Sequence, residues 1–527
     1  MRNIKSKIKS IDFNIFGEVK KWLNSIYIYM LALFFIVGSL VYLIGSNSVV
    51  SLSSVMYVLN FGFDGVSKNT AQMFLTYCST FSIVYSTFGL LILLFLKSEI
   101  IIKYYDNSTR IMKLKIPVKK FSFIAVTCAA FLMFFYYAYK LDWISQYITF
   151  AENQNVPSEF IAQTYIAPES ANINFPGEKR NLICIYAESM EASYTSKRLG
   201  GVEDIDLIPE LSLLARLHTS FSHNELLGGA LFYKDGFFLN GVMGTTPGIV
   251  AVTAGLPFKS ELGIVFAGEV TETLPNAVTF GDILAQHGYN QAFVLGSDAT
   301  FGGRRKYFEN HGNFAIKDWL SAPQDGIVPE GYYDGWWGIE DYKMFEYAQK
   351  TALELAAQDA PFNLTVLTVD THYPGGNVCP LCGNDFKESY KNAISCSDRQ
   401  ISSFIKWVQA QDFYDDTTVI ILGDHITMDS YGDKIHENNP QYLRTTYNVV
   451  INSPAIALNT RNRRFTSFDW LPTIFTAIGA DYDGSRLGLG ADLFSEEQTI
   501  IEKFGWEYVT SELDKHSAFY DALDGKP

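Results

Sequence analysis

Three long apolar runs without a charged residue constrain most strongly what this chain can fold into. They are "SIYIYMLALFFIVGSLVYLIG" (25–45), "AQMFLTYCSTFSIVYSTFGLLILLFL" (71–96) and "FSFIAVTCAAFLMFFYYAY" (121–139). A helix needs about 20 residues to cross a bilayer. The first run is longer than the apolar part of a signal peptide, and further runs follow it. We therefore expect three membrane-spanning helices rather than a cleaved leader or buried helices of a soluble protein.

Basic residues flank these runs unevenly. Six Lys and Arg precede the first run and seven lie between the second and third, whereas the loop at 46–70 carries only Lys68. The positive-inside rule then places the N-terminus and the second loop in the cytoplasm, and everything after about residue 140 outside it. The semi-apolar loop at 46–70 either lies in the membrane interface or forms a fourth span, which would reverse the side of the large domain.

The charge of the chain is also unevenly distributed. Residues 1–150 contain 15 Lys and Arg against 6 Asp and Glu, a balance of +9. Because all 527 residues together carry −15, residues 151–527 carry −24. Nucleic acids bind to basic surfaces, so this acidic part argues against nucleic acid as a partner.

Beyond residue 180, short apolar runs alternate with helix-like segments. The runs are rich in β-branched residues, which is typical of parallel strands buried on both faces. They are "NLICIYAES" (181–189), "QAFVLGSDA" (291–299), "FNLTVLTVDTHYP" (362–374) and "TTVIILGDHI" (417–426). The helix-like segments between them are 274–289, 340–358 and 396–411. This alternation predicts an α/β domain with a mostly parallel central sheet.

Polar side chains end each of these strands. In open α/β sheets, ligands bind beyond the carboxyl ends of the strands, so these groups are expected to converge on one crevice. A lone Asp or His after a strand is more often a turn former, but four such endings together favour a site. The residues are Glu188, Asp298, Asp370 with His372, and Asp424 with His425.

The stretch "GTTPGIVAVTAGLP" (244–257) adds two hydroxyls at the start of an apolar helix. One interpretation is an N-cap, in which a Thr accepts from free amides and Pro247 occupies the first turn. The other is a nucleophile facing an anion, because a helix start presents free amides and the positive end of the helix dipole.

A divalent cation would connect these groups. Glu188, Asp424, His425 and the hydroxyl of Thr245 form a mixed oxygen and nitrogen set suited to manganese or zinc. A bound metal would lower the pKa of the Thr245 hydroxyl and polarise a phosphoryl oxygen. Thr245 would then attack phosphorus and form a phospho-threonine intermediate.

Two further polar residues are candidates for substrate contacts. His372 fits a proton donor to a leaving alcohol or a phosphate contact. Arg304, which follows Asp298 through a Gly-Gly turn, could bind a phosphate or substrate hydroxyls. The alternative for Arg304 is a solvated pair with Arg305.

Four of the six cysteines fall in the outer domain. Cys184 lies inside a predicted strand and is expected to be a small buried hydrophobe. An oxidising compartment would allow one bridge among Cys379, Cys382 and Cys396. Zinc at "CPLC" is discounted, because no second CxxC or His pair follows at a suitable spacing.

The motifs together resemble a known family. They are "NLICIYAES", "GTTPGIVAVTAGLP", "GSDATF", "WGIEDYKMFE", "TVDTHYP", "SCSDRQI" and "VIILGDH", in this order. Over roughly residues 175–495 they resemble the membrane-bound phosphoglycerol transferases of periplasmic glucan modification (phosphoglycerol transferase I), relatives of lipoteichoic acid synthase in the alkaline phosphatase and sulfatase superfamily. Two departures are Gly244, where the family has an aromatic residue, and a shorter C-terminal portion.

The resemblance implies one divalent metal, with manganese expected and zinc or magnesium as alternatives. Carried over by motif, the ligands are Glu188, Thr245, Asp424 and His425. Spacing to Pro247 selects Thr245 over Thr246 as the nucleophile. The resemblance also implies substrate binding by His372, with Arg304 and Asp298 more loosely aligned, and a disulfide between Cys382 and Cys396.

The implied activity is transfer of sn-glycerol 1-phosphate from phosphatidylglycerol to a periplasmic glycan, such as an osmoregulated periplasmic glucan, with release of diacylglycerol. Alternatives are a phosphoethanolamine transferase of the same superfamily and a non-catalytic membrane-anchored glycan-binding protein. The expected organisation is a transmembrane domain (1–145), a linker (146–174), a sulfatase-like catalytic domain (175–497) and a tail (498–527). The expected location is the bacterial inner membrane, with the catalytic domain in the periplasm.

The charge asymmetry makes the orientation testable. Protease added to intact spheroplasts should cleave the domain after residue 140, because the basic residues that remain in the cytoplasm flank the opposite ends of the spans. A cytoplasmic marker protein should stay intact in the same sample. Cleavage seen only after lysis would overturn the orientation.

Overall fold

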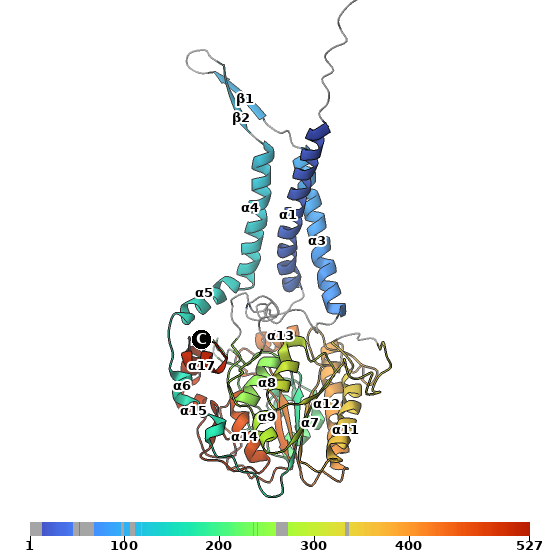
Figure 1. Cartoon of the computed structure of the whole chain (residues 1–527), viewed down its shortest axis with the longest axis vertical. Helices are drawn as coiled ribbons and strands as arrows, with labels where there is room; N and C mark the ends of the chain where they lie inside the picture. The colour runs from blue at the N-terminus through green and yellow to red at the C-terminus, as the bar shows by residue number, and fades with distance from the viewer. Residues whose placement is uncertain are drawn as a thin grey trace, which may run out of the picture. The chain divides into compact units, whose positions relative to one another are not determined.

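The computed structural model describes residues 13–45, 52, 68–95, 100–105, 111–116, 118–234, 237–239, 241–259, 272–332 and 337–526 (Figure 1). The chain divides into two compact units, which are considered separately. The first comprises residues 1–47 and 68–145, and the second comprises residues 48–67 and 146–527.

The first unit consists of three long apolar helices and a hairpin. The helices are α1 (Phe13–Gly45), α3 (Lys68–Phe95) and α4 (Val118–Lys140), and the antiparallel strands β1 (Ile100–Tyr105) and β2 (Ile111–Ile116) lie between α3 and α4. Each helix contains a segment long and apolar enough to cross a membrane, namely Asn24–Tyr42, Ala71–Ile92 and Phe121–Lys140. The three expected apolar helices are therefore present, and each is a candidate membrane span. The loop at 46–70 lies outside the described residues except for residues 52 and 68–70.

A stripe of buried side chains on α1 organises this unit. Its members recur every three or four residues, which places them on one face of the helix. They are Ile26, Met30, Phe34, Val37 and Leu40. Gly38 allows α3 to approach closely, because a Cβ there would lie 3.0 Å from the ring of Phe81.

The second unit is built on a six-stranded sheet in the order β10-β9-β3-β8-β6-β7. Only the edge strand β10 runs antiparallel to its neighbour. The strands are β3 (Asn181–Ala187), β6 (Asn290–Leu295), β7 (Ala315–Lys317), β8 (Phe362–Leu367), β9 (Thr417–Gly423) and β10 (Asn448–Ile451). The four predicted strands thus lie side by side in the middle of the sheet, and the predicted fold class is confirmed.

Helices cover both faces of this sheet, because successive side chains of a strand point to opposite sides. Leu182, Cys184 and Tyr186 of β3 pack into one hydrophobic cluster, while Ile183 and Ile185 pack into another. The first cluster includes α8 (Thr245–Ala254), α9 (Phe280–Gln286), α10 (Arg304–Asn310) and α14 (Trp470–Ala477). The second includes α7 (Pro209–Leu217), α11 (Asp341–Ala356), α12 (Ser389–Gln409) and α13 (Ser430–Asn438). Cys184 is buried, as predicted.

The segments expected as linker and tail lie in the same compact unit as residues 175–497. They contain α5 (Trp143–Gln154), α6 (Phe160–Thr164), α15 (Ile500–Phe504), α16 (Trp506–Asp514) and α17 (Ala518–Leu523). Phe160, Trp506 and Tyr520 belong to the same hydrophobic cluster as α8. These short helices join the core because their apolar side chains would otherwise remain exposed to water.

The remaining elements are short. They are the hairpins β4 (Tyr233–Lys234) with β5 (Phe237–Phe238) and β11 (Arg486–Leu487) with β12 (Gly490–Ala491), and the 3-10 turns η1 (Pro168–Ser170), η2 (Ala192–Tyr194), η3 (Lys197–Leu199), η4 (Phe301–Gly303) and η5 (Ser467–Asp469).

Candidate active site

The register of two central strands brings the predicted acidic residues together. Ala187 at the end of β3 pairs with Gly423 at the end of β9. The next residue on each strand is a carboxylate, Glu188 on one and Asp424 on the other, and His425 follows directly. Of the four polar strand ends, those of β3 and β9 therefore meet here.

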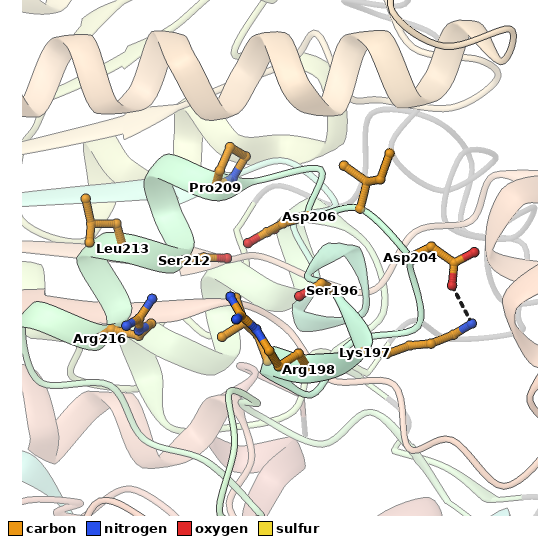
Figure 2. A pocket seen from close by; sticks show the side chains of 11 residues that line it. Ser196, Lys197, Arg198, Asp204, Asp206, Pro209, Ser212, Leu213 and Arg216 are labelled. Atoms are coloured by element: carbon orange, nitrogen blue, oxygen red, sulfur yellow. Dashed lines mark hydrogen bonds and ion pairs between the residues drawn. The ribbon is translucent and has the colours of Figure 1, made fainter.

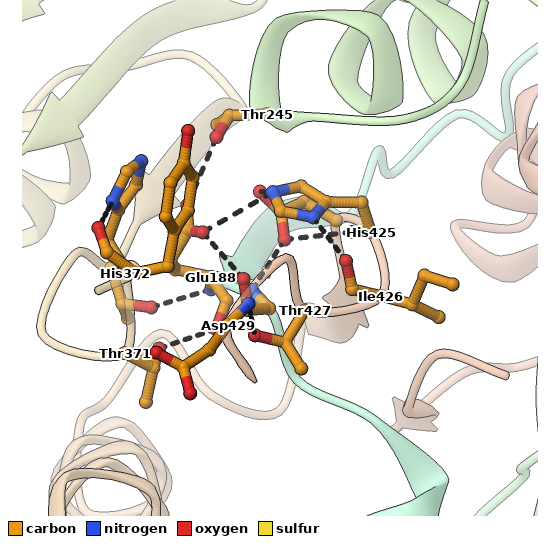
Figure 3. A network of polar contacts seen from close by, with 12 residues as sticks. Glu188, Thr245, Thr371, His372, His425, Ile426, Thr427 and Asp429 are labelled. Carbon is orange, nitrogen blue, oxygen red and sulfur yellow. Dashed lines mark hydrogen bonds and ion pairs between the residues drawn. The ribbon is translucent and has the colours of Figure 1, made fainter. Parts of the chain in front are cut away.

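Glu188, Asp424 and His425 form a tight buried cluster, of which Figure 3 shows Glu188 and His425. Nε2 of His425 lies 3.3 Å from Oε1 of Glu188 and 3.5 Å from Oδ2 of Asp424. One ligand atom from each residue lies within 4.8 Å of the others. Glu188 is 2 % exposed, Asp424 1 % and His425 0 %.

Two atoms of this cluster have no hydrogen-bond partner. They are Oδ2 of Asp424 and Nε2 of His425, both buried. The other His425 nitrogen, Nδ1, lies 2.8 Å from the carbonyl oxygen of Ile426, which fixes Nδ1 as a donor. Nε2 is therefore the nitrogen that would bind a cation, after release of its proton. Buried polar atoms without partners cost free energy, and a divalent cation would be bound by both of them. The residues therefore fit a metal.

The electrostatics of the cluster also favour a bound cation. Burial and then the charge of Glu188 raise the pKa of Asp424 to about 7. Burial alone would lower the pKa of His425, but the charges of Asp424 and Glu188 raise it to about 10. Burial alone would raise the pKa of Glu188, but the charges of His425 and His372 lower it to about 2. Two buried carboxylates thus create a strong preference for positive charge at this position.

Helix α8 adds a hydroxyl to the cluster. Oγ1 of Thr245 donates a hydrogen bond to Oε2 of Glu188 at 3.1 Å. Oγ1 of Thr246 points elsewhere and donates to the carbonyl oxygen of Gly302 at 3.2 Å. The N-cap of α8 is Gly244, with φ of 100°, and no side chain caps the helix. The N-cap interpretation of these threonines is therefore wrong, because the strained cap position requires glycine.

A second glycine allows α8 to reach the cluster. A Cβ on Gly248 would lie 2.3 Å from the carbonyl oxygen of Asp424. Real Cβ contacts are never this short, so the backbone of α8 packs directly on the residue that ends β9. The position of the Thr245 hydroxyl depends on this close approach.

Several neighbours of the cluster were not predicted. Ser189 donates its hydroxyl to Oε1 of Glu188 at 2.8 Å and its backbone N–H to Oδ1 of Asp424 at 2.8 Å. It adopts a φ of 53°, which is unusual for a residue other than glycine. Thr371 also donates its hydroxyl to the carbonyl oxygen of Glu188. A hydroxyl directly after the strand-ending Glu188 is the only sequence signal for Ser189.

A buried ion pair joins the two loops that carry the cluster. Nε of Arg444 donates to Oε2 of Glu191 at 3.0 Å, and a second guanidinium nitrogen donates to the carbonyl oxygen of Thr427 at 2.9 Å. Oε1 of Glu191 also accepts from the N–H of Thr427 at 2.7 Å. Glu191 follows Glu188 by three residues, and Thr427 follows His425 by two. The pair therefore holds both loops in place.

His372 lies at the edge of the cluster, with Thr245 and Glu188 beside it in Figure 3. Its Nδ1 is 2.6 Å from the carbonyl oxygen of Tyr373, so Nε2 is the free acceptor. Its ring stacks on Tyr373 at 4.8 Å and lies 4.5 Å from the ring of Trp337. Burial lowers the pKa of His372, and the charge of Glu188 opposes this only in part. Trp337 was not predicted, because only tertiary structure brings it to His372.

Arg304 is buried rather than solvated. It is 6 % exposed, and its guanidinium donates to the carbonyl oxygens of Phe301 at 3.0 Å and Asp298 at 3.1 Å. Its positive charge contributes to lowering the pKa of His372, which places it on the same side of the site. Asp298 accepts from the N–H of Thr300 at 2.8 Å and lies 3.6 Å from Arg305.

Asp370 is occupied by hydrogen bonds to neighbouring residues of the protein. It accepts hydrogen bonds from the N–H of Asp341 at 3.1 Å and from Asn377 at 2.7 Å and 2.9 Å. Asp341 in turn accepts from the N–H groups of Val369 and Asp370. This buried pair of carboxyl groups fixes the loop that leads to His372.

The three cysteines beyond His372 lie together but are not bonded. Cys379, Cys382 and Cys396 are free thiols whose sulfur atoms lie within 4.8 Å of one another. The disulfide between Cys382 and Cys396 therefore stays a prediction.

A further pocket lies between η3 and α7 (Figure 2). None of its lining residues belongs to the Glu188 cluster. Lys197 and Asp204 at its edge form an exposed ion pair of 2.7 Å, which contributes little to stability. Its lining side chains include Lys197, Arg198, Asp204, Asp206 and Arg216. Positive and negative groups are mixed, so the pocket indicates no charged ligand.

Comparison with known proteins agrees with this arrangement. The sulfatase family model matches residues 180–480. Phosphoglycerol transferase I of Escherichia coli O6:K15:H31 (strain 536 / UPEC) is 29% identical over 340 residues, which cover 62% of this chain and 41% of that protein. The chain thus spans about two fifths of the length of this relative. The family resemblance predicted from the motifs is confirmed.

Among solved structures, the lipoteichoic acid synthase LtaP from Listeria monocytogenes covers 64% of this chain and 82% of its own, with 16% identity and a TM-score of 0.47. The lipooligosaccharide phosphoethanolamine transferase A (EptA) from Neisseria meningitidis covers 86% and 84%, with 13% identity and a TM-score of 0.48.

The contact between α8 and Asp424 yields a prediction. Gly248→Ala should lower activity at least tenfold while secondary structure is retained, because the added methyl group displaces the Thr245 hydroxyl from Glu188. Gly177→Ala is the matched control, since a Cβ at Gly177 meets nothing within 4 Å. Activity and circular dichroism of both variants provide the check, and parent-like turnover by Gly248→Ala would contradict the packing argument.

Proposed function

Since the chain belongs to the sulfatase family, we propose that it is a metal-dependent phosphotransferase that moves sn-glycerol 1-phosphate from phosphatidylglycerol to an extracytoplasmic glycan and releases diacylglycerol. The observation that carries the proposal is the contact between the Thr245 hydroxyl and Glu188 beside Asp424 and His425. Three apolar helices support a lipid donor, because they would hold the chain at a bilayer. The name of the 29% identical relative supports glycerol phosphate as the transferred group.

The residues proposed to hold one divalent metal are Glu188, Thr245, Asp424 and His425. Manganese is proposed, with zinc or magnesium as alternatives, because the donor set contains oxygens and one imidazole nitrogen. When bound, the metal supplies Lewis-acid polarisation of a phosphoryl oxygen and lowers the pKa of the Thr245 hydroxyl. Side chains of the protein would carry out the remaining bond-forming and proton-transfer steps.

Thr245 is the proposed nucleophile. Its Oγ1 forms a bond to the phosphorus of the lipid phosphodiester, and the bond from phosphorus to the diacylglycerol oxygen breaks. The hydroxyl proton is directed towards Glu188, which accepts the hydrogen bond from Oγ1. A hydroxyl of the glycan then attacks the phospho-threonine, forms the new phosphodiester and releases Thr245.

The start of α8 supports this placement. Pro247 has no N–H, so the free N–H groups in the first turn of α8 come from the other residues of that turn. These groups would face a phosphate bound at Thr245. Gly244, at the N-cap, leaves space before the nucleophile because it has no side chain.

His372 is the proposed proton carrier. Its free Nε2 can take the proton of the glycan hydroxyl in the second step, since burial lowers its pKa and favours the neutral ring. In the first step it must carry a proton to the diacylglycerol oxygen. The negative phosphodiester favours the charged ring at that stage, because an adjacent anion raises the pKa of an imidazole.

Arg304 and Asp298 are proposed as substrate contacts. The Arg304 guanidinium is held by the backbone carbonyl oxygens of Phe301 and Asp298, which fix its orientation. Asp298 would accept hydroxyls of the transferred glycerol. Trp337 provides an aromatic wall beside His372, on which a sugar ring of the acceptor could pack.

The two adjacent threonines test the nucleophile. Thr245→Ala should abolish release of diacylglycerol from labelled phosphatidylglycerol, whereas Thr246→Ala should retain at least a tenth of the parent rate, because its hydroxyl faces Gly302. Thr246→Ala is thus the matched control. Phosphatidylethanolamine in the same assay distinguishes the headgroups. An active Thr245→Ala together with an inactive Thr246→Ala would show that the nucleophile is misassigned.

His372 allows a second test. His372→Ala should slow both diacylglycerol release and transfer to glycan, by about 10²- to 10⁴-fold each, the usual contribution of general acid–base catalysis. Metal content should remain that of the parent, because His372 is outside the proposed ligand set. Trp337→Phe serves as a control that keeps an aromatic ring beside His372. Diacylglycerol release at the parent rate by His372→Ala would remove the proton-carrier role.

A further inference from the structure

A second group of ligand atoms lies in the loop after His372. The loop carries Cys379 and Cys382, and the next helix, α12, carries Cys396. Sγ of Cys379 lies 3.6 Å from Sγ of Cys382 and 3.8 Å from Sγ of Cys396. All three sulfur atoms lie within 4.8 Å of one another. Cys379 and Cys396 are buried, with exposed fractions of 4 % and 1 %.

These separations are those of sulfur ligands around one tetrahedral ion. With Zn–S bonds of about 2.3 Å, two ligand sulfurs of tetrahedral zinc are about 3.8 Å apart. A disulfide instead requires about 2.0 Å between two sulfurs and leaves the third thiol unpaired. We propose that Cys379, Cys382 and Cys396 bind one Zn²⁺ ion, in a site separate from the Glu188 cluster. This reverses the discounting of zinc at "CPLC" from the sequence, because the third sulfur comes from α12 and not from a second CxxC.

A neighbouring side chain provides an independent observation. Gln400 lies one helical turn after Cys396 and is 8 % exposed. Its Nε2 lies 3.2 Å from Sγ of Cys396 and 3.5 Å from Sγ of Cys379, so it donates to both sulfurs. Its Oε1 is buried and has no hydrogen-bond partner. The N–H groups stabilise thiolate charge.

The amide of Gln400 is a candidate for the fourth ligand of such an ion. Three thiolates leave one tetrahedral position open. The amide lies against two of the three sulfurs. Rotation of the amide by 180° would present Oε1 itself to the ion, because the two amide atoms exchange places.

The ion would hold the loop of His372 against α12. Asn377, two residues before Cys379, donates to Asp370, which lies two residues before His372. Removal of the ion would free the loop end at Cys382 while these hydrogen bonds remain. The proposal concerns loop stability and is independent of the phosphotransferase reaction, since it shares no ligand with the Glu188 cluster.

The purified full-length protein in detergent tests this proposal. After removal of metal under reducing conditions, Co²⁺ is added and the absorption spectrum is recorded, because thiolate ligands give an intense charge-transfer band that oxygen and nitrogen ligands do not. We expect this band in the parent and in Glu188→Gln, and its loss in Cys396→Ser. Zinc content measured by mass spectrometry should fall by one equivalent in Cys396→Ser.

Two further variants keep the outcome decisive. Cys128→Ser, in an exposed position of α4, is the matched control and should retain the band. Cys382→Ser, at a less buried position, replaces Cys396→Ser if that variant does not fold. A parent without the thiolate band, or peptide mapping that finds Cys382 bonded to Cys396 in the protein as purified, would overturn the proposal.

Discussion

The second unit depends on one electrostatic constraint, the burial of Glu188 and Asp424 side by side at the ends of two central strands. Two buried carboxylates repel each other, and each loses hydration on burial. His425 offsets part of this charge, yet Oδ2 of Asp424 and Nε2 of His425 remain without hydrogen bonds. Neighbouring residues offset part of the free-energy cost of burying these carboxylates. Ser189 donates to the carboxylate of Glu188 and Thr371 to its backbone carbonyl oxygen. The Arg444–Glu191 pair joins the two loops.

The same constraint explains why glycines occur where they do in α8. The helix must approach the charged cluster closely enough for one hydroxyl to reach Glu188. Gly248 permits contact with the backbone of Asp424, and Gly244 adopts the positive φ that turns the chain into the helix. Thr245 and Thr246 are chemically identical neighbours, so their different hydrogen-bond partners arise from helical geometry, which points their side chains about 100° apart.

Much of this could be predicted from the sequence, because the signals are local. Continuous β-branched runs identified β3, β6, β8 and β9, and the Asp-His pair after β9 identified one edge of the cluster. The helix expected at 274–289 is shorter, since Thr279 and Asp282 form a capping box that starts α9 at Phe280. Trp337 and Arg444 could not be predicted. Their partners, His372 and Glu191, are distant in sequence, and a lone Trp or Arg has no pattern that reveals a tertiary contact.

Helices late in the described chain brace the segment that follows α8. The hydroxyl of Tyr520 donates to the carbonyl oxygen of Pro257, just beyond α8, and accepts from the N–H of Lys259. Ser158 and Glu512, 354 residues apart, are joined by a hydrogen bond of 2.6 Å. The segment just after the helix that carries Thr245 is thus braced by a residue 263 positions later in the chain. The arrangement at Glu188 is therefore coupled to contacts of very long range in sequence, and such contacts slow folding because a long loop must close first.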